Sequence, residues 1–284
     1  MPGRTREAML AQPDWLRAVP ADRTLPERAS VVYTGCGTSF HAAQTAGTAV
    51  QALEAVLRPP DVDVLVLVSH EGDTPMTLAA ARAFAGDRWL VTGKPESPLG
   101  ELCEHVVVAT PSVEASWCHT ASYTCAVAAL AALRGEDVSW LPDAVQEALE
   151  VEPLPVSAHE RWLVAGAGPE WPTAQEAVLK LREGAFVAAE AHHLEQLLHG
   201  HLAAVDESVR AFVLEGAAPE RAREAAAALR ELGCDVTVMP TRHPVVDIVP
   251  FQRLTVNLAE AGGIDPDLIR RDDPRWARAR AAYD

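Results

Sequence analysis

The sequence lacks any uninterrupted apolar run of membrane-spanning length, although 49% of its 284 residues are hydrophobic. Its apolar stretch at 62–68 has the length of a strand, whereas a membrane helix needs about 20 such residues. The first seven residues are polar and include Glu7, so they carry no sign of a secretory signal. These absences predict a cytoplasmic protein.

Basic residues are also few, with 24 Lys and Arg against 40 Asp and Glu, which gives a net charge of −16. Such an acidic chain is not expected to bind nucleic acid or an anionic membrane. The five cysteines are scattered and form no CxxC pair. This usage indicates reduced thiols and argues against a disulfide framework or a cysteine zinc site.

Two stretches each place a hydrophobic strand before a glycine-containing turn and a helix start. They cover residues 31–39, with Gly35 and Gly37 in the turn, and residues 64–74, with Gly72 in the turn. The start of a helix leaves backbone N–H groups unpaired at the positive end of its dipole. Both turns are therefore candidate sites for an anion or an oxygen-rich ligand, at the carboxyl ends of neighbouring parallel strands.

Elsewhere the chain alternates hydrophobic strands with helices, which is typical of an α/β protein whose parallel sheet is covered on both faces. A second cycle opens with the strand and glycines at 161–168, which predicts a duplicated unit. We expect a helical segment at 1–27, a first domain at 28–140, a proline-containing linker at 141–158, a second domain at 159–250, and a carboxy-terminal helix and tail at 251–284.

The residues Gly35-Cys36-Gly37-Thr38-Ser39-Phe40-His41 resemble the first motif of sugar isomerase (SIS) domains. Among such proteins, the sequence resembles the isomerase half of glucosamine-6-phosphate synthases. Residues 166–200 continue it, with Leu179-Lys180-Leu181-Arg182-Glu183 and Leu197-Leu198-His199-Gly200. The match covers roughly residues 28–280, and the glutamine-hydrolysing half is absent.

The resemblance implies two SIS domains, each a five-stranded parallel sheet flanked by helices in three layers. It also implies a homodimer with shared active sites, a phosphorylated sugar as ligand and no cofactor. The ligand would be held by the first two turns, in which the matching residues are Gly37, Thr38, Ser39, Ser69 and Thr74.

The resemblance also assigns chemistry to three residues of the second half. Glu183 would move a proton between the first two sugar carbons, His199 would open the ring, and Lys180 would lie in the same pocket. Aldose–ketose exchange needs a base of this kind beside a carbonyl, and partial burial raises the pKa of a carboxylate toward that task. The helical spacing of Glu176, Lys180 and Glu183 puts all three on one face, although an exposed face with Glu–Lys pairs has the same spacing.

Four histidines lie close together in the sequence, at positions 192, 193, 199 and 201. Spacings of this kind could place two of them on one helical face, so a metal site is conceivable. No HExxH motif or carboxylate with ligand spacing accompanies them, and surface or core histidines are the ordinary alternative. We therefore predict no metal and keep His199 for proton transfer.

Several residues depart from the family pattern. Glu71 stands where the phosphate loop usually has a second serine, and its carboxylate would repel a phosphate. Either Glu71 points outward, or the ligand is a neutral or amine-bearing sugar; a protonated His70 could supply compensating charge. Further along, Trp117 and His119 could stack on a sugar or fill the core, and Arg278 in the tail could hold an anion.

The sequence thus predicts a carbohydrate-derivative-binding protein that isomerises a sugar or amino-sugar, with or without phosphate, by enolisation. A fructosamine-type deglycase or deaminase is the first alternative, because it uses the same enolisation and Glu71 could pair with an amine. A non-catalytic sugar-binding SIS module is the second.

Overall fold

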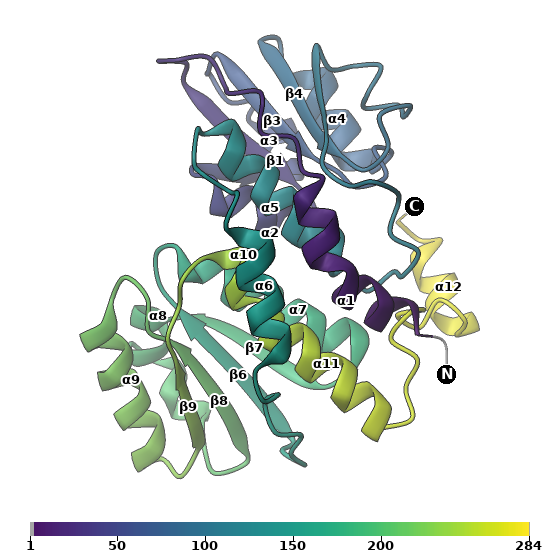
Figure 1. Ribbon diagram of the computed structural model, residues 1–284. Helices are drawn as coiled ribbons and strands as arrows, with labels where there is room; N and C mark the ends of the chain where they lie inside the picture. Colours follow the sequence, from purple (N-terminus) through teal and green to yellow (C-terminus); the bar gives the residue numbers. More distant parts are fainter. Residues whose placement is uncertain (1–2, 284) are drawn as a thin grey trace. The chain divides into compact units, whose positions relative to one another are not determined.

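The computed structural model describes residues 3–283 and shows two compact units (Figure 1). The first contains residues 3–146 and 265–283, and the second contains residues 147–264. Each unit is described by itself below. None of the helices in the described part of the chain combines the length and apolar character that a membrane crossing requires.

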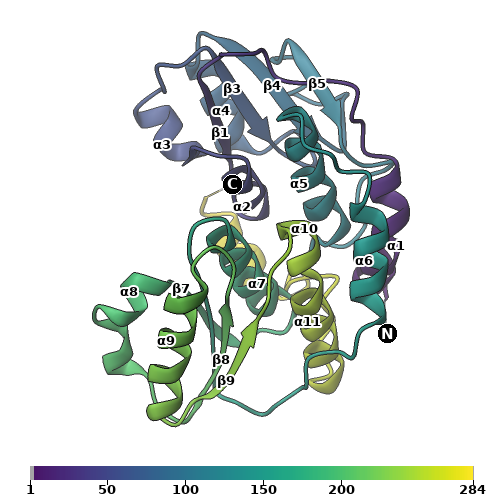
Figure 2. The same cartoon turned by 60° about the vertical axis from the view of Figure 1, so that its left-hand side comes forward.

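The first unit has a five-stranded sheet in which every strand pair is parallel, in the order β2-β1-β3-β4-β5. Figure 2 shows β1, β3, β4 and β5 side by side. The central strand reads Val-Leu-Val-Leu-Val and is buried throughout, as expected for a strand covered on both faces. The strands are β1 (Val31–Gly35), β2 (Ala49–Gln51), β3 (Val64–Val68), β4 (Asp87–Thr92) and β5 (His105–Val108).

Helices cover both faces of this sheet. On one face Ala81 and Phe84 pack against Leu65, Leu67 and other strand residues. On the other face, α2 (Thr38–Thr45) and α5 (Ala121–Leu133) contact each other and the strands. The amino-terminal helix α1 (Arg4–Arg17) packs against α5 (Figure 1). The helices of this unit are α1 (Arg4–Arg17), α2 (Thr38–Thr45), α3 (Ala52–Leu57), α4 (Pro75–Ala83), α5 (Ala121–Leu133) and α12 (Pro274–Arg280), while α6 (Leu141–Glu150) runs across the boundary between the units.

The start of α1 is held by a residue from the far end of the chain. The carboxylate of Asp267 accepts hydrogen bonds from the backbone N–H groups of Arg4 (3.1 Å) and Thr5 (2.7 Å). It also accepts one from the Thr5 hydroxyl at 2.6 Å, and that hydroxyl lies 2.7 Å from the Ser116 hydroxyl. Because Gly3, the residue before α1, has no side chain to supply this cap, Asp267 satisfies the free N–H groups of the first turn.

The second unit has a parallel sheet of four strands, in the order β7-β6-β8-β9. The expectation of five strands in each sheet is therefore wrong for this unit. After β9 the chain forms two helices in place of a fifth strand, and each has a proline in its first turn, where a missing N–H costs nothing. The strands are β6 (Arg161–Gly166), β7 (Ala188–His193), β8 (Val209–Leu214) and β9 (Asp235–Met239).

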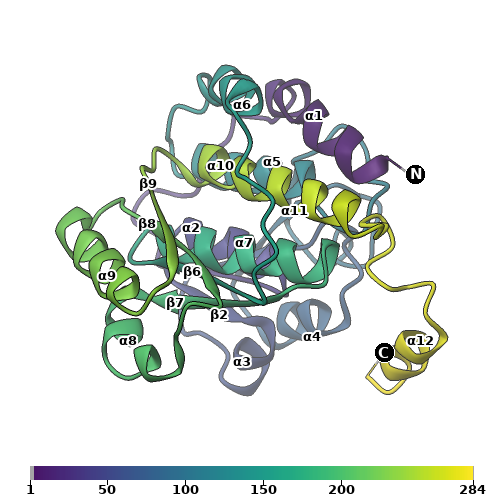
Figure 3. The ribbon, with the colours of Figure 1, turned by 90° about the horizontal axis from the view of Figure 1, so that it is seen from below.

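Helices again cover both faces (Figure 3). On one face Ala225 and Leu229 of α9, with Leu194 and Leu197 of α8, pack against the strands. On the other face the ring of Phe212 meets that of Phe251, with 5.3 Å between their centroids. The helices are α7 (Glu170–Gly184), α8 (Leu194–Leu198), α9 (Pro219–Glu231), α10 (Pro244–Asp247) and α11 (Val249–Ala261), with a short 3-10 helix η1 at His201–Ala204.

Glu170, in the first turn of α7, lies at the carboxyl ends of the strands of this unit. Its carboxylate accepts hydrogen bonds from the N–H of Ala217 (3.1 Å) and the hydroxyl of Thr241 (3.2 Å). Gly216 leaves room for this carboxylate, because a Cβ at that position would lie 1.9 Å from the Glu170 carboxyl carbon and would displace it. Burial raises the pKa of nearby Asp247 to about 6, and the charge of Glu170 adds to the shift.

We expect Asp267→Ala to lower the free energy of unfolding by about 2 kcal/mol, because it leaves the N–H groups of Arg4 and Thr5 without their acceptor. Urea unfolding measures this loss. Asp272→Ala, an exposed change in the same segment, is the control and should shift the value by less than about 0.5 kcal/mol. Equal effects of the two substitutions would show that the Asp267 contacts do not stabilise the fold.

We expect Asp247→Asn to stabilise the protein at pH 7. Between the ordinary pKa of an aspartate and the folded value of about 6, the folded state holds the proton more tightly, so wild-type stability falls as pH rises through this window. An asparagine removes this cost while its oxygen still accepts the Arg242 N–H, now 2.9 Å from Asp247. Urea unfolding should show a gain of about 2 kcal/mol at pH 7 and little difference at pH 4. A variant no more stable than wild type at pH 7 would contradict this.

Candidate functional site

The two turns singled out in the sequence follow adjacent strands of the first unit. β1 and β3 are hydrogen-bonded neighbours, with Thr34 in register with Leu67, so their carboxyl ends lie at one edge of the sheet. Gly35 permits the close approach of α2 to β3, since a Cβ there would lie 2.9 Å from the Ser39 backbone and 3.0 Å from the Val68 oxygen. The structure therefore brings the two predicted ligand loops to neighbouring positions.

The first loop turns into α2 through Gly37, whose φ of 55° favours glycine. Gly37 is exposed, and Thr38 and Ser39 are partly exposed in the first turn of the helix. The N–H of Ser39 donates to the oxygen of Cys36 at 3.1 Å. These three predicted binding residues thus lie together at one helix start, where the helix dipole favours an anion or a ligand oxygen.

The second loop brings the two other predicted hydroxyls together. The Ser69 Oγ lies 3.2 Å from the Thr74 Oγ1, with Thr74 directly before α4. Gly72 has a φ of 70°, and a side chain there would collide with the Ser97 hydroxyl. Glu71 is partly exposed, and neither residues 35–39 nor residues 69–74 include a Lys or Arg. The loops therefore offer hydroxyl and backbone donors without a neighbouring fixed positive charge of their own.

His70 does not supply that charge either. Its Nε2 accepts a hydrogen bond from the backbone N–H of Glu114 at 2.9 Å, which requires an unprotonated nitrogen. Burial, together with the nearby His119, lowers the pKa of His70 to about 4, although Glu114 opposes the shift. The idea that a protonated His70 compensates for Glu71 is therefore not supported near neutral pH.

Three predicted residues of this unit remain: Trp117 and His119 lie in the loop before α5, and Arg278 lies in the tail. The His119 Nδ1 is 3.8 Å from the Glu114 carboxylate, and the His119 ring meets the His70 ring edge-on at 5.2 Å. The guanidinium of Arg271 lies 3.3 Å from the centre of the Trp117 ring, which covers one face of that ring. Arg278 is exposed on α12.

The predicted catalytic pair lies on α7 in the second unit. Lys180 is fully buried, with its Nζ 2.8 Å from the Glu183 Oε2 and 3.3 Å from the Glu176 Oε1. The Glu183 side chain is 24% exposed, whereas that of Glu176 is fully buried. The helical spacing thus puts the three charges on one face, as predicted, and leaves the Glu183 side chain partly exposed.

His199 lies on another element, directly after α8. Its side chain is 73% exposed, and its Nε2 is 3.2 Å from the Glu195 carboxylate, which also accepts from Arg221. The four histidines do not share a helix, because His192 and His193 end β7. Within residues 3–283, no three His, Cys, Asp or Glu side chains are arranged to hold a metal ion.

Two carboxylates that the sequence did not single out hold neighbouring backbone groups: the buried Glu114 and the partly exposed Glu170. Glu114 accepts hydrogen bonds at the start of α5, and Glu170 does so at the carboxyl ends of the second sheet. The sequence offers only weak signals for them. Gly216 marks the close approach of Glu170, and Gly93 marks that of the His70 ring beside Glu114, but a glycine does not reveal which side chain will fill the space it leaves.

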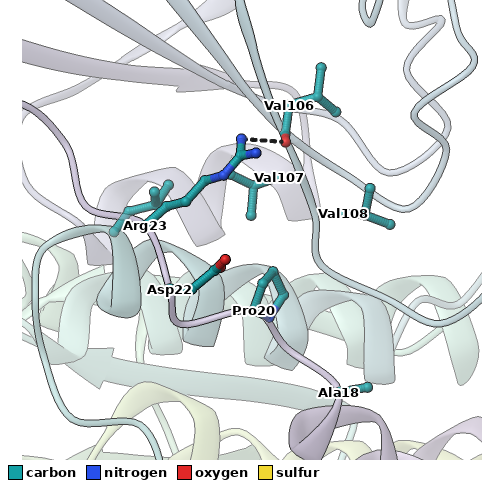
Figure 4. Close-up of a pocket in the computed structure, with 8 residues that line it drawn as sticks. Ala18, Pro20, Asp22, Arg23, Val106, Val107 and Val108 are labelled. Carbon is teal, nitrogen blue, oxygen red and sulfur yellow. Dashed lines mark hydrogen bonds between the residues drawn. The ribbon is translucent and has the colours of Figure 1, made fainter.

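A separate hollow of about 320 Å³ lies in the first unit beside the edge strand β5 (Figure 4). Arg23 reaches across it and donates to the Val106 oxygen at 3.4 Å, with Val107 and Val108 on the same side. None of the predicted site residues lines this hollow. We therefore keep two separate candidate regions, the hydroxyl-bearing loops of the first unit and the α7 pair of the second.

Comparisons with known proteins give relatives in sequence. The chain is 26% identical over 321 residues to a glutamine–fructose-6-phosphate aminotransferase (isomerizing) of Xanthomonas campestris, covering 88% of this chain and 52% of that protein. It is 30% identical over 273 residues to the Thermus thermophilus protein of the same name, covering 77% and 45%. The chain thus spans about half the length of these curated relatives. No family model matches the sequence.

Solved structures share the fold over nearly the whole chain. A glucosamine-6-phosphate deaminase from Thermotoga maritima has a TM-score of 0.79 at 22% identity, covering 93% of this chain and 97% of its own. The C-terminal domain of the glucosamine-fructose-6-phosphate aminotransferase from Francisella tularensis gives 0.76 at 20%, covering 93% and 97%. Tagatose-6-phosphate ketose/aldose isomerase from Escherichia coli gives 0.73 at 17%, covering 94% and 95%. Sequence and fold together confirm the resemblance that the motifs predicted, to the sugar isomerase (SIS) proteins and to the isomerase type found in the glutamine–fructose-6-phosphate aminotransferases.

Proposed function

We propose that this chain binds a phosphorylated sugar or amino-sugar and interconverts its aldose and ketose forms by enolisation, without a cofactor. The observation that carries the proposal is the partly exposed side chain of Glu183, whose carboxylate lies 2.8 Å from the buried ammonium of Lys180. The names of the sequence relatives and of one structural neighbour support it, because they describe isomerising enzymes of hexose phosphates.

The chemistry asks one base to take a proton from the carbon next to a carbonyl and return it to the neighbouring carbon. A carboxylate fixed by a partner on one oxygen can do this while its position stays constant through both transfers. Lys180 cannot turn away from Glu183, because burial leaves it no solvent and its other carboxylate partner lies on the same helix face. Glu183 is therefore the proposed base.

The proposed ligand contacts follow from the loops of the first unit. The hydroxyls of Ser69 and Thr74, with the helix start at Gly37, Thr38 and Ser39, would hold the phosphate or the sugar oxygens. His199, which is exposed and paired with Glu195, would transfer the proton that opens the ring. We further propose a cytoplasmic homodimer with shared active sites, in which residues 28–140 and 159–250 act as the two SIS domains.

A deaminase or deglycase is the second candidate. Glu71 favours it, because a carboxylate in a loop without Lys or Arg suits an amine better than a phosphate. The similarity in fold to a glucosamine-6-phosphate deaminase is consistent with it. Release of ammonia from glucosamine 6-phosphate, or of an amino acid from a fructosamine, would favour this candidate over isomerisation. A ligand that stabilises the protein thermally without any turnover would indicate a binding module.

We expect Glu183→Gln to lower kcat at least about 100-fold with fructose 6-phosphate, glucosamine 6-phosphate or tagatose 6-phosphate, because the amide cannot accept the carbon-bound proton. Two readouts measure the effect: product formation, and wash-out of deuterium from the carbon next to the carbonyl. The unphosphorylated sugars, run in parallel, show whether the phosphate is needed.

Glu220→Gln is the matched control, since Glu220 is an exposed glutamate of the same unit, on α9. It should retain wild-type turnover. Circular dichroism and thermal unfolding should show that Glu183→Gln remains folded, because Lys180 keeps its contact with Glu176. Wild-type activity in Glu183→Gln would remove Glu183 from the mechanism.

A further inference from the structure

The ring of His70 is turned into the first unit, away from the surface of the loop that carries Ser69 and Thr74. Gly93 makes room for it, because a Cβ there would lie 2.5 Å from the His70 Cε1 and 2.7 Å from its Nδ1. The backbone of His70 is also fixed, since its oxygen accepts from the Gly93 N–H (2.9 Å) and the Thr92 hydroxyl (3.1 Å). His70 is therefore one of the points at which the ligand loop is joined to the interior.

The partner of the ring is the backbone N–H of Glu114, at 2.9 Å from Nε2. Glu114 belongs to a different loop, the one before α5, and only 5% of it is exposed. A buried N–H of this kind needs its acceptor, so the contact fixes the distance between the two loops.

Glu114 is in turn fixed by α5. Its carboxylate accepts from the Thr120 N–H (2.8 Å), the Thr120 hydroxyl (2.9 Å) and the Ser122 N–H (2.8 Å). These bonds cap the helix, because the Thr120 side chain does not cap α5 itself. Burial alone would raise the pKa of Glu114, but His119 and the donors of Ser122 outweigh it and lower the pKa to about 2, so the carboxylate stays charged.

From this geometry we propose that His70 and Glu114 are positioning residues, which connect the ligand loop at 69–74 to the start of α5 and so set the place of the Ser69 and Thr74 hydroxyls. The inference rests on the proposed function for the identity of the ligand. The mechanical connection does not depend on the proposed function, because it is argued only from the hydrogen bonds of His70 and Glu114.

Two substitutions of His70 separate its ring nitrogen from its bulk. His70→Phe fills the space beside Gly93 but offers no acceptor to the Glu114 N–H. His70→Gln keeps an oxygen that can accept from it. For the sugar phosphate that wild type turns over, we expect His70→Phe to raise KM about tenfold and lower kcat less than threefold, because Glu183 is not part of this connection. In His70→Gln the increase in KM, measured on a logarithmic scale, should be at most half of that in His70→Phe.

Amide hydrogen exchange tests the connection without any substrate. In His70→Phe the amides of residues 71–74 should exchange at least about tenfold faster than in wild type, while His70→Gln should lie between the two. The amides of β8, in the other unit, serve as the internal reference and should not change. The exchange rates test the connection between the loops even if the protein turns over no sugar. In that case only the proposed function fails.

Either of two results would overturn the proposal. One is a KM and an exchange rate for His70→Phe that match wild type. The other is equal change in His70→Phe and His70→Gln, which would mean that the shape of the ring matters and its nitrogen does not.

Discussion

The buried ammonium of Lys180 is the constraint on which the candidate chemistry depends. An unpaired charge in the interior costs several kcal/mol, so a fully buried lysine needs carboxylates within contact distance. Glu176 and Glu183 meet that need one helical turn away on either side. The fixed lysine holds Glu183 where the helix ends, at Gly184, with about a quarter of its side chain exposed. The ion pair of Lys180 and Glu183 therefore has two effects: it compensates the buried charge of the lysine, and it orients the proposed base.

The first unit places hydroxyl groups in two loops that contain no Lys or Arg. Parallel strands end at one edge of the sheet, so β1 and β3 deliver both loops to neighbouring positions. Gly35 allows the helix to approach the sheet, and Gly72 allows the second loop its turn. Buried carboxylates from distant segments then fix the surroundings: Asp267 caps α1, and Glu114 caps α5. Asp267 and Glu114 thus bind the starts of α1 and α5, two helix starts that are not part of the candidate site.

Periodicity in the sequence was sufficient to predict the α/β class, the buried strands β1, β3 and β6, and the shared face of Glu176 and Glu183. It could not predict β7, because Ala, Glu and His have little preference for strands, and this segment is extended only because it pairs with β6. Contacts such as Thr5 with Asp267 or His70 with Glu114 join residues far apart in the chain, and no local pattern encodes them.

The central proposal is that Glu183 on α7 acts on a sugar held by the hydroxyl-bearing loops. A crystal structure with a bound sugar phosphate tests it most directly. The account predicts phosphate or sugar oxygens on Ser39, Ser69 and Thr74, and a Glu183 oxygen within about 3.5 Å of the first two sugar carbons, from the same chain or a second copy. A sugar bound at those loops with no Glu183 carboxylate near its carbons would contradict the account.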